Sequence, residues 1–349
     1  MTQTPAKYKG DSWIRGLDSI RFVLAFIVFL SHLQNPFHDY MINSPHHPLR
    51  ILGMLSGVLF SGIGSVMAFF IISGFVIHYP NREKYPETMP FLIRRWLRIG
   101  IPLIVISAIA GIFHQFSAIP IWSLYCELIY YTLYPMLLRA RGSWRTKFLI
   151  SFFISVLLVA FLARGDWSSL IHQRNMNYVG AYWQLGDFMT WIVGLPCWLL
   201  GVMLAQDINS AQAKTSAIRA WIFRFSVLAA GIGLDILKFH FFVSYLLSMN
   251  LFAIGLFFWI RYEILYFKTR QPPALLEFSG KFSYSLYLCH NVFVFFIVML
   301  IPLNMYSYFP IILLTLFSSY LFYRLVEKPS HQLSKRVARQ FQGRKLAIN

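Results

Sequence analysis

The feature that most constrains this chain is a series of long apolar runs separated by short basic segments. A helix needs about 20 apolar residues to cross the hydrocarbon core of a bilayer. The sequence therefore predicts an all-α integral membrane protein, a bundle of about ten transmembrane helices. We expect these spans near residues 14–33, 52–79, 99–113, 121–138, 147–163, 188–206, 219–237, 241–260, 283–302 and 307–325.

The composition agrees with a membrane protein and excludes an ordinary soluble domain. Hydrophobic residues make up 57% of the chain and charged residues 13%, against roughly 25% charged residues in soluble domains. The first apolar run is too long for a cleavable signal peptide and carries Arg21 and His32 within it. We expect one membrane domain over residues 1–349, with tails at 1–12 and 327–349 and no appended periplasmic domain.

The distribution of basic residues predicts the topology. The formal net charge of +18 could suggest nucleic-acid binding, but the basic residues lie between the apolar runs and not along one surface. If the N-terminus is cytoplasmic, the outer segments carry only Arg50, Arg164, Arg174 and Lys238 of the 31 Lys and Arg. Lys and Arg concentrate on the cytoplasmic side of membranes. We therefore expect both termini in the cytoplasm and no nucleic-acid partner.

Two ionisable residues lie in the first predicted span. Arg21 and His32 are eleven residues apart, which places both on one helix face and separates them by roughly 16 Å along its axis. Arg21 is predicted near the cytoplasmic surface and His32 near the outer one. Charged groups in spans are costly unless they are paired or face a cavity, so both are candidate functional residues. A snorkelling Arg and an interfacial His are the structural alternative.

A carboxylate in the fourth predicted span is the expected partner of His32. Glu127 follows Trp122 near the outer end of that span, at about the depth we expect for His32. A carboxylate beside an imidazole would orient the ring and raise its basicity, as in a catalytic triad. The alternative is an inter-helix hydrogen bond with no catalytic role.

Three arginines, Arg94, Arg95 and Arg98, precede the third predicted span on the cytoplasmic side. Arg94 and Arg98 share a helix face and form a fork suited to phosphate oxygens. The alternative is a basic loop that only sets topology. We expect no metal site, because the outer histidines show no ligand spacing and the three cysteines lie in apolar runs.

Six segments, in order along the chain, resemble acyltransferase family 3, a family of integral membrane O-acyltransferases that includes bacterial polysaccharide and O-antigen acetylases. Ser19, Phe22 and Leu128 depart from the family's usual residues. The segments are Leu17 and Asp18 with Arg21 and His32; Phe69 to Phe75; Arg94, Arg95 and Arg98 with Pro102; Trp122 to Leu124 with Glu127; Ser283 to His290; and Glu327 to Pro329.

The resemblance implies an acyl-CoA donor, with acetyl-CoA the first expectation and succinyl-CoA the second, and no permanently bound cofactor. It implies a lipid-linked or polymeric carbohydrate acceptor and a location in the bacterial inner membrane, among lipids as partners. Arg21, Arg94, Arg95, Arg98 and Ser73 are assigned to the donor. His32, oriented by Glu127, would be the general base or would form an acyl-histidine.

Four further residues are candidates for the lining of the cavity: Asp18, Trp122, Tyr287 and His290. His290 is expected at mid-membrane and not next to His32. Ser73 is expected too far from His32 to be a nucleophile for it, and close helix packing is its alternative role. A proton-coupled transporter or flippase using Arg21, His32 and Glu127 is the second functional class, although no internal repeat supports it.

Overall fold

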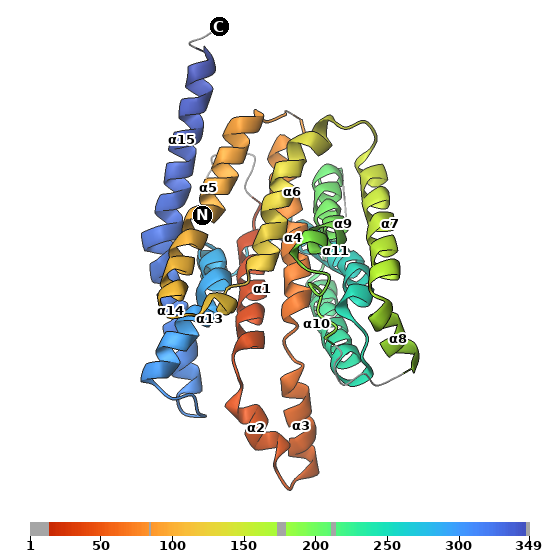
Figure 1. Ribbon diagram of the computed structural model, residues 1–349, viewed down its shortest axis with the longest axis vertical. Coiled ribbons are helices and arrows are strands. Elements are labelled where there is room, and N and C mark those ends of the chain that lie inside the picture. The colour runs from red at the N-terminus through yellow and green to blue at the C-terminus, as the bar shows by residue number, and fades with distance from the viewer. Residues whose placement is uncertain (1–13, 84, 173–178, 211–213, 347–349) are drawn as a thin grey trace, which may run out of the picture.

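The computed structural model describes residues 14–83, 85–172, 179–210 and 214–346, and within them every regular element is helical (Figure 1). Short turns of 3-10 helix follow α4 and precede α6, and a π-helical turn joins α14 to α15. The α-helices are α1 (Leu17–His32), α2 (Pro36–Ile42), α3 (His47–Gly57), α4 (Gly62–His78), α5 (Thr88–Ile112), α6 (Ile121–Arg139), α7 (Trp144–Leu162), α8 (Arg164–His172), α9 (Asp187–Asp207), α10 (Ala217–Phe241), α11 (Tyr245–Thr269), α12 (Ala274–Gly280), α13 (Ser283–Leu300), α14 (Tyr308–Phe322) and α15 (Lys328–Leu346).

Each of the ten predicted spans corresponds to a helix, but fewer than ten helices are long and apolar enough to cross a membrane. Among the described residues 8 meet that condition, or 9 if α1 and α2, which meet at a bend of 55°, are taken as one span. The helix that fails is α6, because Ser123, Glu127 and several tyrosines lower its hydropathy. One face of α6, with Ser123, Tyr130, Tyr131 and Tyr134, is buried in the bundle, whereas the opposite face, with Ile121, Tyr125 and Met136, is exposed.

The third predicted span begins too late. We expected it near residues 99–113, whereas α5 runs from Thr88 to Ile112. Arg94, Arg95 and Arg98 therefore belong to the helix and not to a loop before it. The three arginines lie in the second and third turns of α5, where they are compatible with helix because Arg is a good helix former.

Glycines allow the tightest helix contact in the bundle, between α4 and α9. A Cβ atom on Gly74 would meet the carbonyl oxygen of Trp198, and one on Gly201 would meet that of Ile71. Small residues let helix backbones approach closely within membranes. This contact brings α4 and α9 together behind α6 and fixes the depth of Ser73, which lies directly before Gly74.

The helix α1 lies inside the bundle, in contact with α4, α12 and α13. A Cβ on Gly280 of α12 would meet the backbone of Asp18, so the start of α1 is closely covered. Ser19 is held there by Glu277, whose carboxylate accepts from the Ser19 amide and hydroxyl at 3.1 and 2.8 Å. This packing positions the face of α1 that carries Arg21 and His32.

The two ends of the molecule differ in shape (Figure 1). The hairpin of α2 and α3 projects at one end, and α15 extends at the other as a continuation of α14 through a π-helical turn. The α15 helix runs along α5, where the Ser330 hydroxyl donates to the Leu97 carbonyl at 2.9 Å. The predicted topology assigns the hairpin to the outside and α15 to the cytoplasm, and that orientation stays a prediction.

Candidate active site

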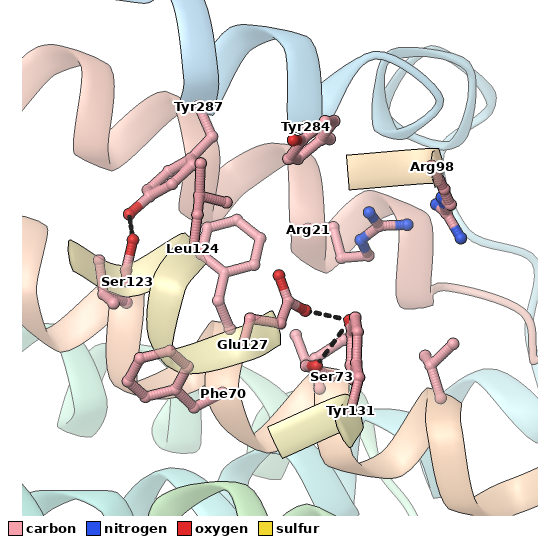
Figure 2. A pocket seen from close by; sticks show the side chains of 14 residues that line it. Arg21, Phe70, Ser73, Arg98, Ser123, Leu124, Glu127, Tyr131, Tyr284 and Tyr287 are labelled. Carbon is pink, nitrogen blue, oxygen red and sulfur yellow. Dashed lines mark hydrogen bonds between the residues drawn. The ribbon is translucent and has the colours of Figure 1, made fainter. Parts of the chain in front are cut away.

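A cavity of about 100 Å³ lies inside the bundle between α1, α4, α5, α6 and α13 (Figure 2). Its wall combines two arginines, one carboxylate, hydroxyl groups and an apolar side. The lining residues are Arg21, Val66, Phe69, Phe70, Ile72, Ser73, Val76, Arg98, Ser123, Leu124, Glu127, Tyr131, Tyr284 and Tyr287. Five residues predicted for the site therefore meet in one space: Arg21, Ser73, Arg98, Glu127 and Tyr287.

The cationic end of the cavity is formed by Arg21 and Arg98, whose guanidinium groups lie on the same side of it in Figure 2. Arg21 contacts Asp18 at 3.4 Å, so Asp18 acts through Arg21 and is not itself part of the lining. The two guanidinium groups are the charged groups that line this end, and the carboxylates of Asp18 and of the buried Glu327 lie behind them. It is the end predicted to face the cytoplasm.

The arginines of α5 do not act as one cluster. Arg94 is exposed on the helix surface and does not line the cavity. Arg95 lies over the rings of Phe91 and Tyr131, with its guanidinium carbon 5.7 and 5.9 Å from the ring centroids. Only Arg98 of the three reaches the lining, because the faces of α5 separate these side chains.

A directed chain of hydrogen bonds leads to Glu127. The indole nitrogen of Trp198 can only donate, and it donates to the Ser73 hydroxyl at 3.3 Å. Tyr131 donates its only hydroxyl proton to the Glu127 carboxylate, so in the 3.1 Å contact between the two hydroxyl groups Ser73 donates and Tyr131 accepts (Figure 2). Ser73 therefore has a polar role at the cavity wall, beyond the close packing of its neighbour Gly74.

Tyr131 and Tyr284 line the cavity although neither was among the predicted site residues. Tyr131 lies four residues after Glu127, one helical turn away on the same face, so the spacing offered a signal. Tyr284 lies within the Ser283–His290 segment, and its hydroxyl donates to the Ile99 carbonyl at 3.2 Å. That bond ties α13 to α5, and no sequence spacing indicates it.

A second hydrogen bond closes the far end of the cavity. The hydroxyl groups of Ser123 and Tyr287 are 2.5 Å apart and join α6 to α13. Trp122, predicted to line the cavity, instead packs away from it, with its ring stacked 5.2 Å from that of Trp183 and edge-on to Phe70. Trp122 therefore supports the wall from behind.

His32 and His290 are in direct contact, which corrects the expectation that His290 lies apart from His32. The Nε2 atom of His290 is 3.1 Å from Nδ1 of His32, and the ring centroids are 5.1 Å apart. His290 is completely buried, whereas His32 is exposed at the end of α1. The expectation failed because the depth of each residue was counted from the start of its own span. Helices can begin at different depths in the membrane, so such counts cannot be compared between helices.

Glu127 is not the partner of His32 in the structure. The described contacts of Glu127 lead to Tyr131, and those of His32 lead to Val28 and His290. Glu127 lies one turn further along α6 than Ser123, whose partner Tyr287 lies nearly one turn before His290 on α13. These steps separate the levels of Glu127 and His290 by roughly 10 Å at 1.5 Å per residue.

Comparison with known proteins identifies the family of the chain. Residues 14–324 match the model of acyltransferase family 3, described as an acyltransferase domain. The chain belongs to this family. The matched range of the acyltransferase includes every residue that lines the cavity, as well as His32 and His290. Neither a search of curated proteins nor a search of solved structures gave a match.

The family places this chain among multi-pass membrane acyltransferases and favours that class over the transporter alternative. Among the described residues, no group of three or more His, Cys, Asp or Glu side chains is arranged to hold a metal ion. The candidate site thus consists of a cavity with two arginines at one end and a histidine pair outside its lining. The catalytic and donor-binding roles assigned to its residues stay predictions.

Proposed function

We propose that this acyltransferase moves an acyl group, with acetyl the first choice, from cytoplasmic acyl-CoA to a hydroxyl of a cell-envelope or exopolysaccharide sugar across the bacterial inner membrane. The thioester bond to sulfur breaks, an ester bond to the sugar oxygen forms, and the hydroxyl proton passes to the CoA thiolate. The family supports acyl transfer. The arrangement of residues along α1 supports the direction from donor to acceptor.

The observation that carries this proposal is the hydrogen bonding of the two histidines, which determines where their protons lie. Nδ1 of His290 is 3.0 Å from the Leu286 carbonyl and 2.9 Å from that of Tyr287. Carbonyl oxygens only accept, so this nitrogen carries the proton and Nε2 of the neutral ring has a free lone pair. That lone pair faces Nδ1 of His32.

His32 is thereby held in one tautomer. Its Nδ1 lies between two acceptors, the Val28 carbonyl at 2.9 Å and His290 at 3.1 Å, and therefore carries the proton. Its Nε2 is left unprotonated, as a general base or a nucleophile requires. When Nε2 takes up the hydroxyl proton of the sugar, both acceptors stabilise the positive charge on the ring.

The cationic end of the cavity supports binding of an acyl-CoA. Arg21 and Arg98 present guanidinium groups, which bind phosphate oxygens through charge-assisted, often bidentate hydrogen bonds. The cavity of about 100 Å³ is too small for a nucleotide, since ligand sites of that class span about 300–1,000 Å³. The nucleotide would stay outside, and the thin pantetheine arm would extend inward past Ser73 and Glu127.

The contact between Ser123 and Tyr287 lies between this cavity and the histidine pair, so the thioester must pass it. Both side chains line the cavity, and the backbone of Tyr287 holds His290 in place. The hydroxyl–hydroxyl bond of 2.5 Å joins two helices that can part without leaving Ser123 unpaired, because Ser123 also donates to the Pro120 carbonyl. In the proposed reaction this bond opens when the acyl group arrives.

The acceptor approaches from the outer side, where His32 is exposed at the end of α1. A lipid-linked or polymeric carbohydrate can reach His32 there without entering the bundle. Arg21 and His32 are separated by roughly 16 Å along the helix, a distance that a small head group cannot cover but an extended arm can. This separation supports a thioester donor carried on a long flexible chain.

The decisive experiment combines a cellular and a purified system. Mass spectrometry of surface glycans should show an ester that is lost on deletion of the gene and restored by the wild-type chain but not by His32→Ala. Proteoliposomes holding acetyl-CoA on the cytoplasmic side should release CoA thiol only when the acceptor is present on the outer side. Glycans unchanged by deletion, or thiol release without any ester product, would exclude the proposed reaction.

A further inference from the structure

A second and larger space lies on another side of α1. It is a groove of about 590 Å³, inside the size range of small-molecule sites of about 300–1,000 Å³. Ile20, Val23 and Ile27 of α1 form one wall, and α10 and α11 form the other. Its lining shares no residue with the candidate active site.

The groove is apolar along most of its length and opens toward the lipid. Val23 is 40% exposed, Leu228 37% and Phe225 62%, and all three line it. In a bilayer such surface meets hydrocarbon and not water. From Trp221 to Gly231 of α10 the groove extends roughly 15 Å, about half the thickness of a hydrocarbon core of about 30 Å. Its length therefore corresponds to the acyl chain of one leaflet.

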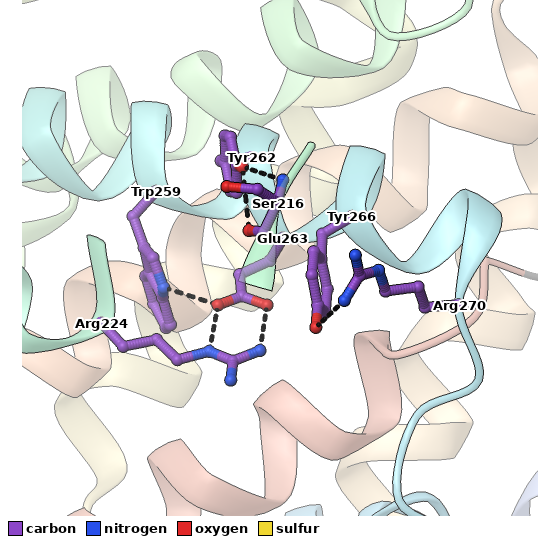
Figure 3. Close-up of polar contacts among 7 residues, drawn as sticks. All are labelled: Ser216, Arg224, Trp259, Tyr262, Glu263, Tyr266 and Arg270. Carbon is purple, nitrogen blue, oxygen red and sulfur yellow. Dashed lines mark hydrogen bonds and ion pairs between the residues drawn. The ribbon is translucent and has the colours of Figure 1, made fainter. Parts of the chain in front are cut away.

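At one end of the groove, polar side chains form a cluster held together by hydrogen bonds and an ion pair (Figure 3). Arg224 of α10 donates to Glu263 of α11 through Nε at 2.6 Å and Nη2 at 2.9 Å. The Trp259 indole donates to the same carboxylate at 3.1 Å. The guanidinium also lies over the rings of Trp221 and Tyr266, 4.8 and 5.6 Å from their centroids. An ion pair within a span is costly unless it has a function or is fully satisfied.

The outward side of this ion pair is cationic. The Glu263 side chain is 2% exposed and saturated by three donors, whereas that of Arg224 is 28% exposed. Among the described residues, Nη1 of Arg224 has no hydrogen-bond acceptor. Arg270 lies outside the groove lining, with the Tyr266 ring between it and Arg224 (Figure 3); it donates to the Tyr266 hydroxyl at 3.1 Å and has no carboxylate partner among the described ion pairs. Glu277 does not compete, because Ser19 holds it outside the lining.

We propose that this groove binds an anionic glycerophospholipid of the bilayer. One acyl chain lies along α1 between Val23 and Ile27, and the phosphate accepts a hydrogen bond from Nη1 of Arg224, while Arg270 adds positive charge at the same end of the groove. Arg224 lies about two turns from the start of α10, at the end predicted to face the cytoplasm, where basic groups attract anionic lipids. Lipid binding at this site does not require the proposed transfer reaction.

The test measures lipid binding by the full chain in detergent after removal of native lipid. Dioleoyl phosphatidylglycerol and dioleoyl phosphatidylcholine share their chains, so their difference in affinity reports the head-group contact. We expect the anionic lipid to bind about tenfold more tightly, the equivalent of about 1.4 kcal/mol. Inorganic phosphate represents only the phosphate of the lipid and free oleate only its acyl chain. Each should bind far more weakly than the whole lipid.

Two variants and a control locate the site. Arg224→Gln with Glu263→Gln removes both charges without leaving either buried alone, and should abolish the preference for the anionic lipid. Leu228→Trp fills the groove and should weaken binding of both lipids. Arg219→Gln, an exposed charge on the same helix and outside the lining, should bind like the wild type.

Three outcomes would overturn the proposal. The first is equal affinity of the wild-type chain for the two lipids, and the second is a preference that survives both groove variants. The third is a different occupant of the groove. It would be a polyprenyl phosphate if that lipid displaces phosphatidylglycerol and binds more tightly. It would be a second copy of the chain if native mass spectra show lipid-free dimers that Leu228→Trp dissociates.

Discussion

The two spaces beside α1 differ in volume and in the polar groups that line them. The cavity that contains Arg21 and Glu127 is small, lies between five helices and combines charged and hydroxyl groups with an apolar side. The groove that contains Val23 and Arg224 is about six times larger by volume, apolar and open to lipid. One helix thus separates a compartment suited to chemistry from one suited to lipid. The following variants test whether the two spaces are as separate in function as in structure.

The largest effect is expected at His32. His32→Ala removes the unprotonated Nε2 and should lower the rate of acyl transfer by about 10²–10⁴-fold, the usual contribution of a general base. The measurement is ester formation in proteoliposomes at matched protein content. His46→Ala, an exposed histidine of the outer hairpin, is the matched control. Transfer at the wild-type rate in His32→Ala would remove the histidine pair from the mechanism.

His290 is expected to act through His32. His290→Leu removes the acceptor at Nδ1 of His32 and should lower kcat by about 10–100-fold, as loss of an orienting partner usually does. The KM for acyl-CoA should stay unchanged, because His290 lies outside the cavity lining. His290→Gln, whose amide oxygen can accept the same proton, should recover part of the loss. If the His290→Leu and His290→Gln variants are equally slow, His290 contributes through packing and not by orienting the His32 ring.

Glu127 and Tyr131 are expected to act as one unit, separate from His32. Loss of one hydrogen bond to a charged group costs about 1.5–3 kcal/mol, so we expect Glu127→Gln to slow transfer about tenfold or more. Adding Tyr131→Phe should change little further, whereas Glu127→Gln with His32→Ala should show independent losses. The rates of the single and double variants form two cycles. If Glu127 is instead coupled to His32 and not to Tyr131, the catalytic pair of His32 and Glu127 expected from the sequence would be supported.

Arg98 and Arg94 provide a comparison within one helix. Arg98 lines the cavity and Arg94 does not, so Arg98→Ala should raise the KM for acyl-CoA about tenfold while Arg94→Ala leaves it nearly unchanged. Arg98→Lys should restore only part of the affinity, because an ammonium cannot form the bidentate contact. Steady-state kinetics at saturating acceptor would separate these cases. Equal effects at Arg94 and Arg98 would point to general attraction by a basic surface.

The smallest expected effect links the two spaces. A lipid along α1 would brace the helix that carries Arg21 and His32, so turnover should rise about fivefold as phosphatidylglycerol replaces phosphatidylcholine in the vesicles, near the lower end of coupling between sites. The neutral variant Arg224→Gln with Glu263→Gln should not respond. A response of equal size in this variant would mean that the lipid acts elsewhere.

The fold was largely predictable from the sequence because apolar length is a strong local signal. Each expected span corresponds to a helix, and the error at α5 arose because Arg94 and Arg95 resemble loop residues although the helix already begins at Thr88. The packing of the polar face of α6 against the bundle was not predictable, because Glu127 and several tyrosines only make α6 a marginal candidate for a membrane span. Its place inside the bundle depends on contacts with α9 and α4.

The sequence predicted several residues of the candidate site but not which of them contact one another. Arg21, Glu127 and His32 stood out because ionisable groups are rare in apolar runs. The partner of His32 lies 258 residues away on α13, and counting residues along two helices cannot determine how their starts are offset. Tyr131, as the immediate partner of Glu127, was available from spacing alone and was overlooked because a tyrosine is common in such helices.

The length of α1 has a consequence for the membrane itself. Its 16 residues span about 24 Å, less than the hydrocarbon thickness of about 30 Å, and α2 turns away by 55°. A short helix surrounded by protein on three sides leaves a hydrophobic mismatch, which bilayers relieve by thinning locally. We therefore expect a dimple in the outer leaflet beside His32. A sugar carried at the surface would sink toward the donor there, and the distance that the acyl group must travel would fall well below the width of the undisturbed membrane.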